Sequence, residues 1–193
     1  MEMTAVAEPT TSGRPLRADA RRNYERLLSA AREVFREHET DTSLEKIAAR
    51  AEVGIGTLYR HFPTRLTLLE AVYRDEVDDL ATGTEKLLAS AEPWEALERY
   101  LHLFMSYATT KRALFHELVD AVGRDAELLT HSRQVINGTA EAVLTRAQEA
   151  GVARRDVEVS DMIRLVGGCT MMPEASAEQS DRIIAVVLAG LRA

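Results

Sequence analysis

The side chains best suited to chemistry in this 193-residue chain lie in one short stretch, residues 55–62, which reads Ile-Gly-Thr-Leu-Tyr-Arg-His-Phe. Leu58 and Phe62 are four residues apart, so on a helix they share one face and can anchor it to a core. The polar side chains left outside would be those of Thr57, Tyr59, Arg60 and His61. Such groups donate hydrogen bonds to phosphate oxygens and to base edges. The stretch therefore predicts recognition of nucleic acid by hydrogen bonding, not catalysis.

The residues before this stretch predict the elements that hold it. Thr42-Ser43-Leu44-Glu45 is a capping box, in which Thr42 would accept a hydrogen bond from an early backbone N–H while Glu45 reaches back to the cap. We therefore expect a helix to begin at about Ser43 and to be interrupted at residues 52–54. Gly54 and Gly56 lack side chains where backbone would approach phosphate or base edges. Two short helices joined by a tight turn, with a helix packed before them, form the minimal DNA-reading unit.

Charge is distributed unevenly along the chain, which carries a net charge of −7. Residues 1–65 contain eleven Lys or Arg residues and ten Asp or Glu residues, whereas the remaining residues are strongly acidic. Seven arginines fall within residues 14–36, so the N-terminal edge is locally basic. We interpret them either as general electrostatic help in binding a polyanion, with Arg14, Arg17, Arg21 and Arg22 as an arm for the minor groove, or as a solvated helix face.

Apolar residues recur at helical spacing through most of the chain, and aromatic residues, Gly and Pro are sparse. We expect an all-α fold of about nine helices. The first begins at about Asp19, a fourth includes Pro63 in its first turn, and one or two separate helices lie between Lys111 and Arg124. Ser160 would cap a later helix, and a second capping box at residues 176–179 opens the last helix, which ends near Leu191.

Composition excludes several other classes of protein. No apolar run approaches the roughly 18–20 residues of a transmembrane helix, and the N-terminus lacks the layout of a signal peptide, so a cytoplasmic protein without a membrane partner is expected. The single cysteine, Cys169, cannot form an internal disulfide. The sequence offers no catalytic triad, phosphate-binding glycine loop or metal cluster, so no catalytic residue, metal or cofactor is predicted.

Residues 42–51 and 56–65 closely resemble the N-terminal domain of TetR-family regulators, and the resemblance extends over roughly residues 19–75. It implies an all-helical homodimer that binds double-stranded operator DNA, in most members as a repressor. The domains expected are a disordered leader at 1–15, a three-helix helix-turn-helix domain at 16–65, and a ligand-binding and dimerisation domain at 66–193. Glu52 stands where the family often has a turn glycine, so a residue with a side chain is expected at positive φ.

The same resemblance assigns roles to the DNA-binding candidates. Phosphate contacts are implied for Ser43, Thr57, Tyr59, His61 and Arg65, where Arg65 replaces the usual lysine at the start of the fourth helix. Base contacts are implied for Ile55, Gly56 and Arg60, with a further contact from Lys46. Thr42 and Gly54 complete the predicted DNA-binding set.

The C-terminal domain is expected to bind an unidentified small-molecule effector and a second copy of the chain. Apolar candidates to line a ligand cavity, each of which is otherwise a core residue, are Trp94, Tyr100, Phe104, Tyr107, Phe115, Leu118, Cys169 and Met172. The last two long helices are apolar enough to cover both a core and a partner. Predicted dimer-interface residues on them are Met162, Val166, Ile184, Val187 and Leu191.

The sequence thus predicts a DNA-binding transcriptional regulator, most simply a ligand-responsive repressor that binds a pseudo-palindromic operator as a homodimer. Two alternatives stay open: a helix-turn-helix module that docks protein, and a regulator without a small-molecule inducer. An enzyme is the least favoured class.

Overall fold

The computed structural model describes residues 13–37, 42–123, 126–170 and 176–193, and within these ranges it forms eight α-helices. They are α1 (Gly13–Glu37), α2 (Leu44–Arg50), α3 (Ile55–His61), α4 (Arg65–Ser90), α5 (Pro93–Val122), α6 (Glu127–Glu149), α7 (Val159–Cys169) and α8 (Ala177–Leu191). The one β feature of these ranges is an isolated bridge between Ala153 and Arg192. The expected all-α fold is confirmed.

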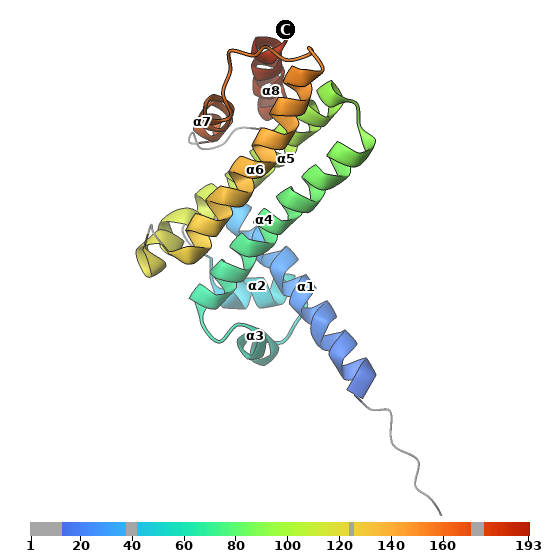
Figure 1. Ribbon diagram of the computed structural model, residues 1–193. Helices are drawn as coiled ribbons and strands as arrows, with labels where there is room; N and C mark the ends of the chain where they lie inside the picture. The colour runs from blue at the N-terminus through green and yellow to red at the C-terminus, as the bar shows by residue number, and fades with distance from the viewer. Residues whose placement is uncertain (1–12, 38–41, 124–125, 171–175) are drawn as a thin grey trace, which may run out of the picture.

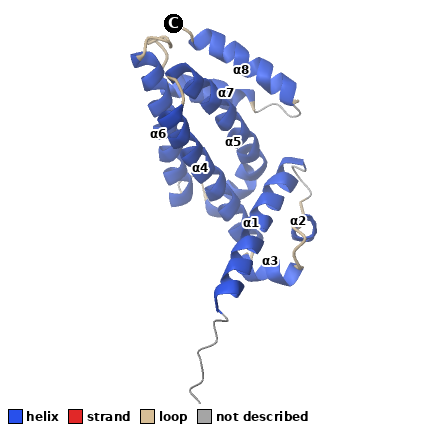
Figure 2. Ribbon diagram, turned by 90° about the vertical axis from the view of Figure 1, so that its right-hand side faces the viewer, coloured by secondary structure: helices blue, strands red, loops and turns tan. Residues whose placement is uncertain are grey.

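The three long helices α4, α5 and α6 pack against one another and form the middle of the molecule (Figure 1). The short helices α2 and α3 lie at one end beside α1, whereas α7 and α8 lie at the opposite end beside the C-terminus (Figures 1 and 2). The second half of α1 also packs on α4 and α5. Hence α1 and α4 join the end that carries the predicted DNA-binding residues to the rest of the molecule.

Helix α1 forms because its apolar side chains recur on one face. Leu27 and Ala31 are fully buried, and Val34 and Phe35 are nearly so. The helix begins at Gly13, six residues before the position predicted from the sequence, so residues 13–15 of the predicted leader are helical. Residues 1–12 of that leader lie outside the described residues.

Several predicted helix boundaries are corrected by the structure. Ser43, not Thr42, caps α2, and its hydroxyl accepts a hydrogen bond from the backbone N–H of Lys46 at 3.2 Å. Pro63 precedes α4, whose cap is Thr64 in a reciprocal capping box with Thr67. Helix α5 runs unbroken to Val122, so the separate helix expected after Lys111 is its continuation.

The predictions for the last two helices have mixed outcomes. Helix α7 begins at Val159, one residue before the predicted cap Ser160. The cap predicted for α8 is confirmed, because the hydroxyl of Ser176 accepts from the backbone N–H of Gln179 at 3.2 Å. The helix ends at Leu191, as expected. Within the described ranges, no helix is long and apolar enough to cross a membrane.

Candidate nucleic-acid interface

Helix α3 has one buried side and one open side. Leu58 is fully buried and Phe62 is 2% exposed, so these two residues anchor the helix as their spacing predicts. Tyr59 and Arg60 are exposed, and Ile55 is exposed at the start of the helix. The polar groups predicted for DNA recognition therefore face outward from a helix that is fixed from behind.

The turn before α3 contains the backbone strain expected from the sequence. Glu52 has φ of 52°, the one positive φ of a non-glycine residue within the described ranges. The backbone N–H groups of Glu52 and Val53 donate to Ala49 and Ala48, which closes the end of α2. The carboxylate of Glu52 also pairs with Arg26 of α1 at 2.7 Å. The turn is therefore held both by its backbone and by an ion pair to α1.

The other candidates on α2 and at the start of α3 differ in accessibility. Lys46, Gly54 and Gly56 are exposed. A Cβ added at either glycine would meet no atom within 4 Å in the isolated chain, so the open space there faces away from the protein. Thr42, in contrast, is 8% exposed and lies in the interior. Its side chain is therefore poorly placed for the predicted DNA contact.

Aromatic rings support the end of α3. Tyr24 of α1 lies edge-on to the imidazole of His61, with ring centroids 6.0 Å apart, and also contacts Phe62 at 5.2 Å. His61 and Thr57 are half-buried, whereas Tyr59 is 47% exposed. Of the three, Tyr59 is the most accessible to a large partner.

Arg65 does not stand free at the start of α4. Its Nη1 donates to the carbonyl oxygen of Thr42, and its Nε and Nη2 donate to the two carboxylate oxygens of Glu117 on α5, the latter at 2.9 Å. Its guanidinium carbon also lies 5.5 Å from the centroid of the Phe35 ring. The predicted phosphate ligand is thus engaged by a carboxylate from the middle of the molecule.

The arginines of α1 do not form a uniform basic surface. Arg21 pairs with Glu25 at 2.9 Å, and Arg22 pairs with Asp19. Arg32 and Arg36 turn inward and join α1 to α4 and α5. Arg14 and Arg17 have side chains outside the described part of the chain. The interpretation as a minor-groove arm is therefore weakened for the described arginines, which already have carboxylate partners.

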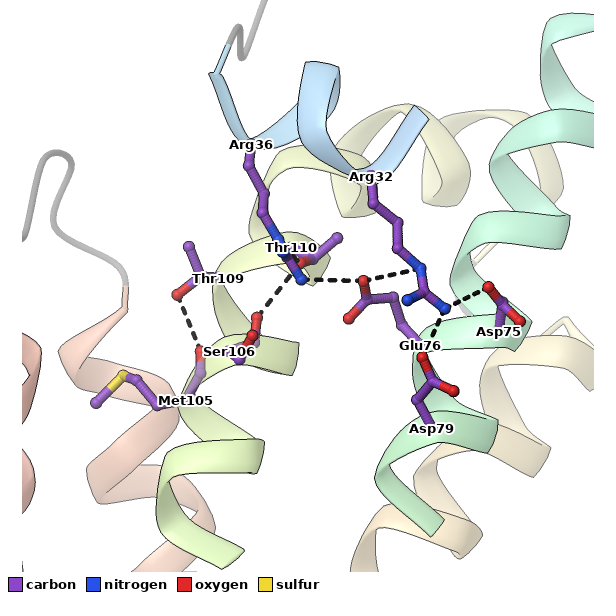
Figure 3. Close-up of polar contacts among 9 residues, drawn as sticks. All are labelled: Arg32, Arg36, Asp75, Glu76, Asp79, Met105, Ser106, Thr109 and Thr110. Carbon is purple, nitrogen blue, oxygen red and sulfur yellow. Dashed lines mark hydrogen bonds and ion pairs between the residues drawn. The ribbon is translucent and has the colours of Figure 1, made fainter. Parts of the chain in front are cut away.

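A polar junction between α1 and α4 is formed by Arg32 and Arg36 with three acidic residues of α4 (Figure 3). Arg32 contacts Asp75, Asp79 at 2.7 Å and Glu76 at 3.3 Å. Arg36 contacts Glu76 at 3.2 Å, and its Nε donates to the hydroxyl of Thr110 on α5 at 2.6 Å. Burial raises the pKa of Glu76, although the two arginines oppose the shift. This junction fixes the orientation of α1 relative to the long helices.

Replacing Glu76 with alanine should lower the free energy of unfolding by about 1–3 kcal/mol, because Arg36 loses a charged hydrogen-bond acceptor and Arg32 loses one of its three ion-pair partners. The loss is limited because Arg32 keeps its aspartate partners and Arg36 keeps Thr110. Urea denaturation monitored by circular dichroism would measure it. As the control, Glu95→Ala removes one exposed pair with Arg99 and should change stability by less than about 1 kcal/mol. Equal effects of the two substitutions would contradict a structural role for the junction.

Most of the predicted ligand-lining residues pack into the core. Tyr100 and Leu118 are fully buried and Phe104 is 3% exposed. The Tyr100 and Phe104 rings stack at 6.0 Å, and the Tyr107 hydroxyl donates to that of Tyr73 at 3.3 Å. Burial raises the pKa of Tyr100 to about 12. These contacts are those of a close-packed core and leave no evident lining surface.

The remaining ligand candidates have other surroundings. Trp94 lies under the guanidinium of Arg192 at 4.2 Å, and Phe115 lies under the ammonium of Lys111 at 4.7 Å. Cys169 borders a surface groove between α7 and α8. Met172 lies outside the described residues. Another pocket, of about 430 Å³, lies between α4 and α6, and its polar lining includes Arg74, Asp78, Glu127 and His131.

The groove between α7 and α8 has a volume of about 550 Å³ and a mainly apolar lining. The predicted dimer residues are 5% exposed or less, so their side chains pack within one chain: Met162, Val166, Ile184, Val187 and Leu191. Leu165 and Val186 also line the groove, and they are 51% and 73% exposed. That α7 and α8 form a dimer interface stays a prediction, and the residues that project from them into the groove are not the predicted ones.

The sequence gives no sign of the roles of Glu117 and Glu76, and Leu165 and Val186, although part of the apolar content of the last two helices, were not selected as interface residues. The two glutamates act through contacts with helices far away in sequence, and no local pattern marks them. Leu165 and Val186 are apolar residues adjacent to chosen ones, and helical phase at 100° per residue is the signal that separates them. Among the described residues, no group of three His, Cys, Asp or Glu side chains is placed to hold a metal ion.

Two family models match the chain. Residues 27–72 match "Bacterial regulatory proteins, tetR family", and residues 92–193 match "Transcriptional regulator SbtR-like, C-terminal domain". The first covers α2, α3 and the parts of α1 and α4 that hold them. The second covers α5 to α8, including both the groove between α7 and α8 and Glu117.

Similar proteins include a solved structure and two curated regulators. The crystal structure of the TetR transcriptional regulator SCO0520 from Streptomyces coelicolor superposes with a TM-score of 0.75 at 38% identity, covering 87% of this chain and 97% of that one. The HTH-type transcriptional regulator SAR0097 of Staphylococcus aureus is 31% identical over 127 residues, 64% of each chain. The HTH-type transcriptional repressor Rv3405c of Mycobacterium tuberculosis is 35% identical over 97 residues, 50% of each chain. The matched regions thus span less than two thirds of either curated relative.

Proposed function

The chain belongs to the TetR family of bacterial transcriptional regulators, and from this premise we propose that it binds a pseudo-palindromic operator as a homodimer and represses transcription. The observation that carries the proposal is the construction of α3, whose Leu58 and Phe62 are buried while Tyr59 and Arg60 face outward. The repressor Rv3405c, 35% identical over the matched region, supports repression as the direction of control. The proposal gives the chain no catalytic role and places it in the cytoplasm with the DNA.

DNA binding would use two kinds of contact. Ser43, Tyr59 and His61 hold phosphate groups on either side of the major groove, while the start of α3 approaches base edges. Two copies of α3 would enter successive major grooves, about 34–36 Å apart, which is one turn of B-DNA. Ile55, Gly56 and Arg60 are the exposed positions at which sequence would be read.

A homodimer would form through the groove between α7 and α8. Leu165 and Val186 project from this face, and the buried residues Met162, Val187 and Leu191 form its floor. A second copy of the same surface would cover these apolar side chains across a two-fold axis, as a self-complementary interface requires.

An effector would act on the middle of the molecule. The pocket between α4 and α6 offers a cation, two carboxylates and an imidazole, so it suits a polar ligand with both hydrogen-bond donors and acceptors. Because α4 begins beside α2 and α3, a ligand that shifts α4 would change the spacing of the two recognition helices.

The experiment that tests the proposal is a fluorescence anisotropy titration of the protein against duplex DNA from upstream of its own gene. We expect tighter binding to this duplex than to a shuffled one, with an affinity that falls as salt is raised. Equal affinity for both sequences at all salt concentrations would leave the operator proposal without support.

Replacing Arg60 with alanine should relax base preference. An arginine that donates two hydrogen bonds to guanine contributes about 1–3 kcal/mol of discrimination, so the variant should lose preference at one position in each half-site. His61→Ala serves as the contrast, because loss of a phosphate contact weakens binding to all sequences alike. Binding to a set of single-base operator variants would measure both. A uniform loss with Arg60→Ala would make Arg60 a phosphate contact instead.

A further inference from the structure

The guanidinium group of Arg65 lies where three elements meet. It belongs to the first residue of α4, it donates to the carbonyl oxygen of Thr42 just before the cap of α2, and it pairs with Glu117 of α5. Glu117 is 52 positions further along the chain and lies in the part matched by the C-terminal family model. The contact therefore joins the proposed DNA-binding end directly to α5.

Glu117 engages the part of the guanidinium group that a phosphate would engage. Arginine binds carboxylates and phosphates alike through two parallel N–H donors on one edge of its planar fork. Glu117 takes the edge formed by Nε and Nη2 with both of its oxygens, and Thr42 takes Nη1. A phosphate that forms two parallel hydrogen bonds with the Nε–Nη2 edge must displace the Glu117 carboxylate.

The ion pair between Arg65 and Glu117 can open, so that Arg65 binds another group. The side chains of Arg65 and Glu117 are 34% and 45% exposed, so water can solvate both groups when they separate, and such pairs contribute little to stability. Arg32, in the polar junction between α1 and α4, differs from Arg65 because its side chain is only 21% exposed and contacts three carboxylates. Arg32 therefore has a structural role, whereas Arg65 can change partners.

We propose that Glu117 is a positioning residue that competes with the DNA backbone for Arg65. The inference rests on the proposed function, since it requires DNA at α2 and α3. When DNA binds, a phosphate takes the Nε–Nη2 edge of Arg65 from Glu117, and the displaced carboxylate then lies close to the phosphate and weakens binding. Because the competing group is on α5, any ligand that holds α5 against the start of α4 favours release of DNA.

The test compares the full-length protein with its Glu117→Gln variant in anisotropy titrations at several salt concentrations, against both upstream and shuffled duplexes. Glutamine keeps the size of the side chain but removes its charge. We expect the variant to bind both duplexes about 3- to 10-fold more tightly than the wild-type protein at ~0.1 M salt. The slope of the logarithm of the association constant against the logarithm of salt concentration should become steeper by no more than about 0.9 for each protomer. Glu95→Gln, which removes an exposed α5 carboxylate paired with Arg99, is the matched control and should leave both quantities unchanged.

The Arg65→Ala background shows whether Glu117 acts through Arg65. In that background Glu117→Gln should have no effect, because the group for which the carboxylate competes is absent. Unchanged or weaker binding by Glu117→Gln in the wild-type background would overturn the inference, as would an equal gain in both backgrounds. If the wild-type protein binds neither duplex at low salt, the proposed function fails and the inference fails with it. Wild-type binding that Glu117→Gln leaves unchanged overturns the inference alone.

Discussion

Replacing Val186 with aspartate is expected to convert the dimer to a monomer and to lower operator affinity by at least about 100-fold. A charged carboxylate would be buried in the mainly apolar contact where α7 and α8 of two chains meet, at a cost of several kcal/mol. A monomer would then lose the second half-site, and linked binding of two sites typically contributes a factor of about 10² to 10⁴. Sedimentation velocity and anisotropy on the same samples would measure the two effects.

The fold of the single chain should tolerate this substitution, because Val186 is 73% exposed. Ala185→Asp is the matched control: Ala185 is the preceding residue of α8, it is exposed, and it does not line the groove. It should leave both the dimer and operator binding intact. A Val186→Asp protein that stays dimeric would contradict the assignment of this face as the interface.

Replacing Leu58 with alanine is expected to lower the free energy of unfolding by about 2–5 kcal/mol. Leu58 is fully buried, so the substitution removes apolar contacts and leaves a cavity beneath α3. Since α3 then loses one of its two anchors, binding to all DNA sequences should weaken as well. Denaturant unfolding and anisotropy at a temperature well below the unfolding transition would measure the two losses.

The Tyr59→Phe substitution tests the exposed side of α3 alone, whereas Leu58→Ala tests the buried side. Tyr59 is the next residue and is 47% exposed, so removal of its hydroxyl should change stability by no more than about 0.5 kcal/mol. It should nevertheless weaken DNA binding several-fold, because the hydroxyl no longer donates to a phosphate. If Leu58→Ala left stability unchanged, or Tyr59→Phe left DNA binding unchanged, the division of α3 into two functional sides would be wrong.

The features of α1 to α3 could be predicted from sequence because their causes are local. The spacing of Leu58 and Phe62 determines which side of α3 is buried. The positive φ of Glu52 was expected from the family resemblance, because Glu52 stands where TetR-family regulators often have a turn glycine. The cap of α2 was predicted one residue too early because threonine and serine are both good N-cap residues. In the structure the side chain of Thr42 is buried, and Ser43 caps the helix.

The rest of the site depends on contacts between distant parts of the chain. Nothing near Arg65 in sequence indicates that Glu117 would meet it, and nothing near Arg36 indicates Thr110 or Glu76. The aromatic residues of α5 fit a ligand cavity and a packed core equally well as a pattern, and the contact between Tyr73 and Tyr107 favours the core. For the proposed interface, composition pointed to the last two helices, whereas the exact helical phase is needed to select the exposed residues Leu165 and Val186.

The most direct test of the account is selection of bound fragments from a randomised duplex library, followed by sequencing, with the wild-type protein and a variant that carries both Tyr59→Ala and His61→Ala. The account predicts that the wild-type protein enriches an inverted repeat whose half-sites are centred about 10–10.5 base pairs, or a multiple of this, apart. The double variant should enrich the same repeat much more weakly, because the lost phosphate contacts weaken binding to all sequences alike. A wild-type protein that enriches no motif, or equal enrichment in both samples, would contradict DNA recognition by α3.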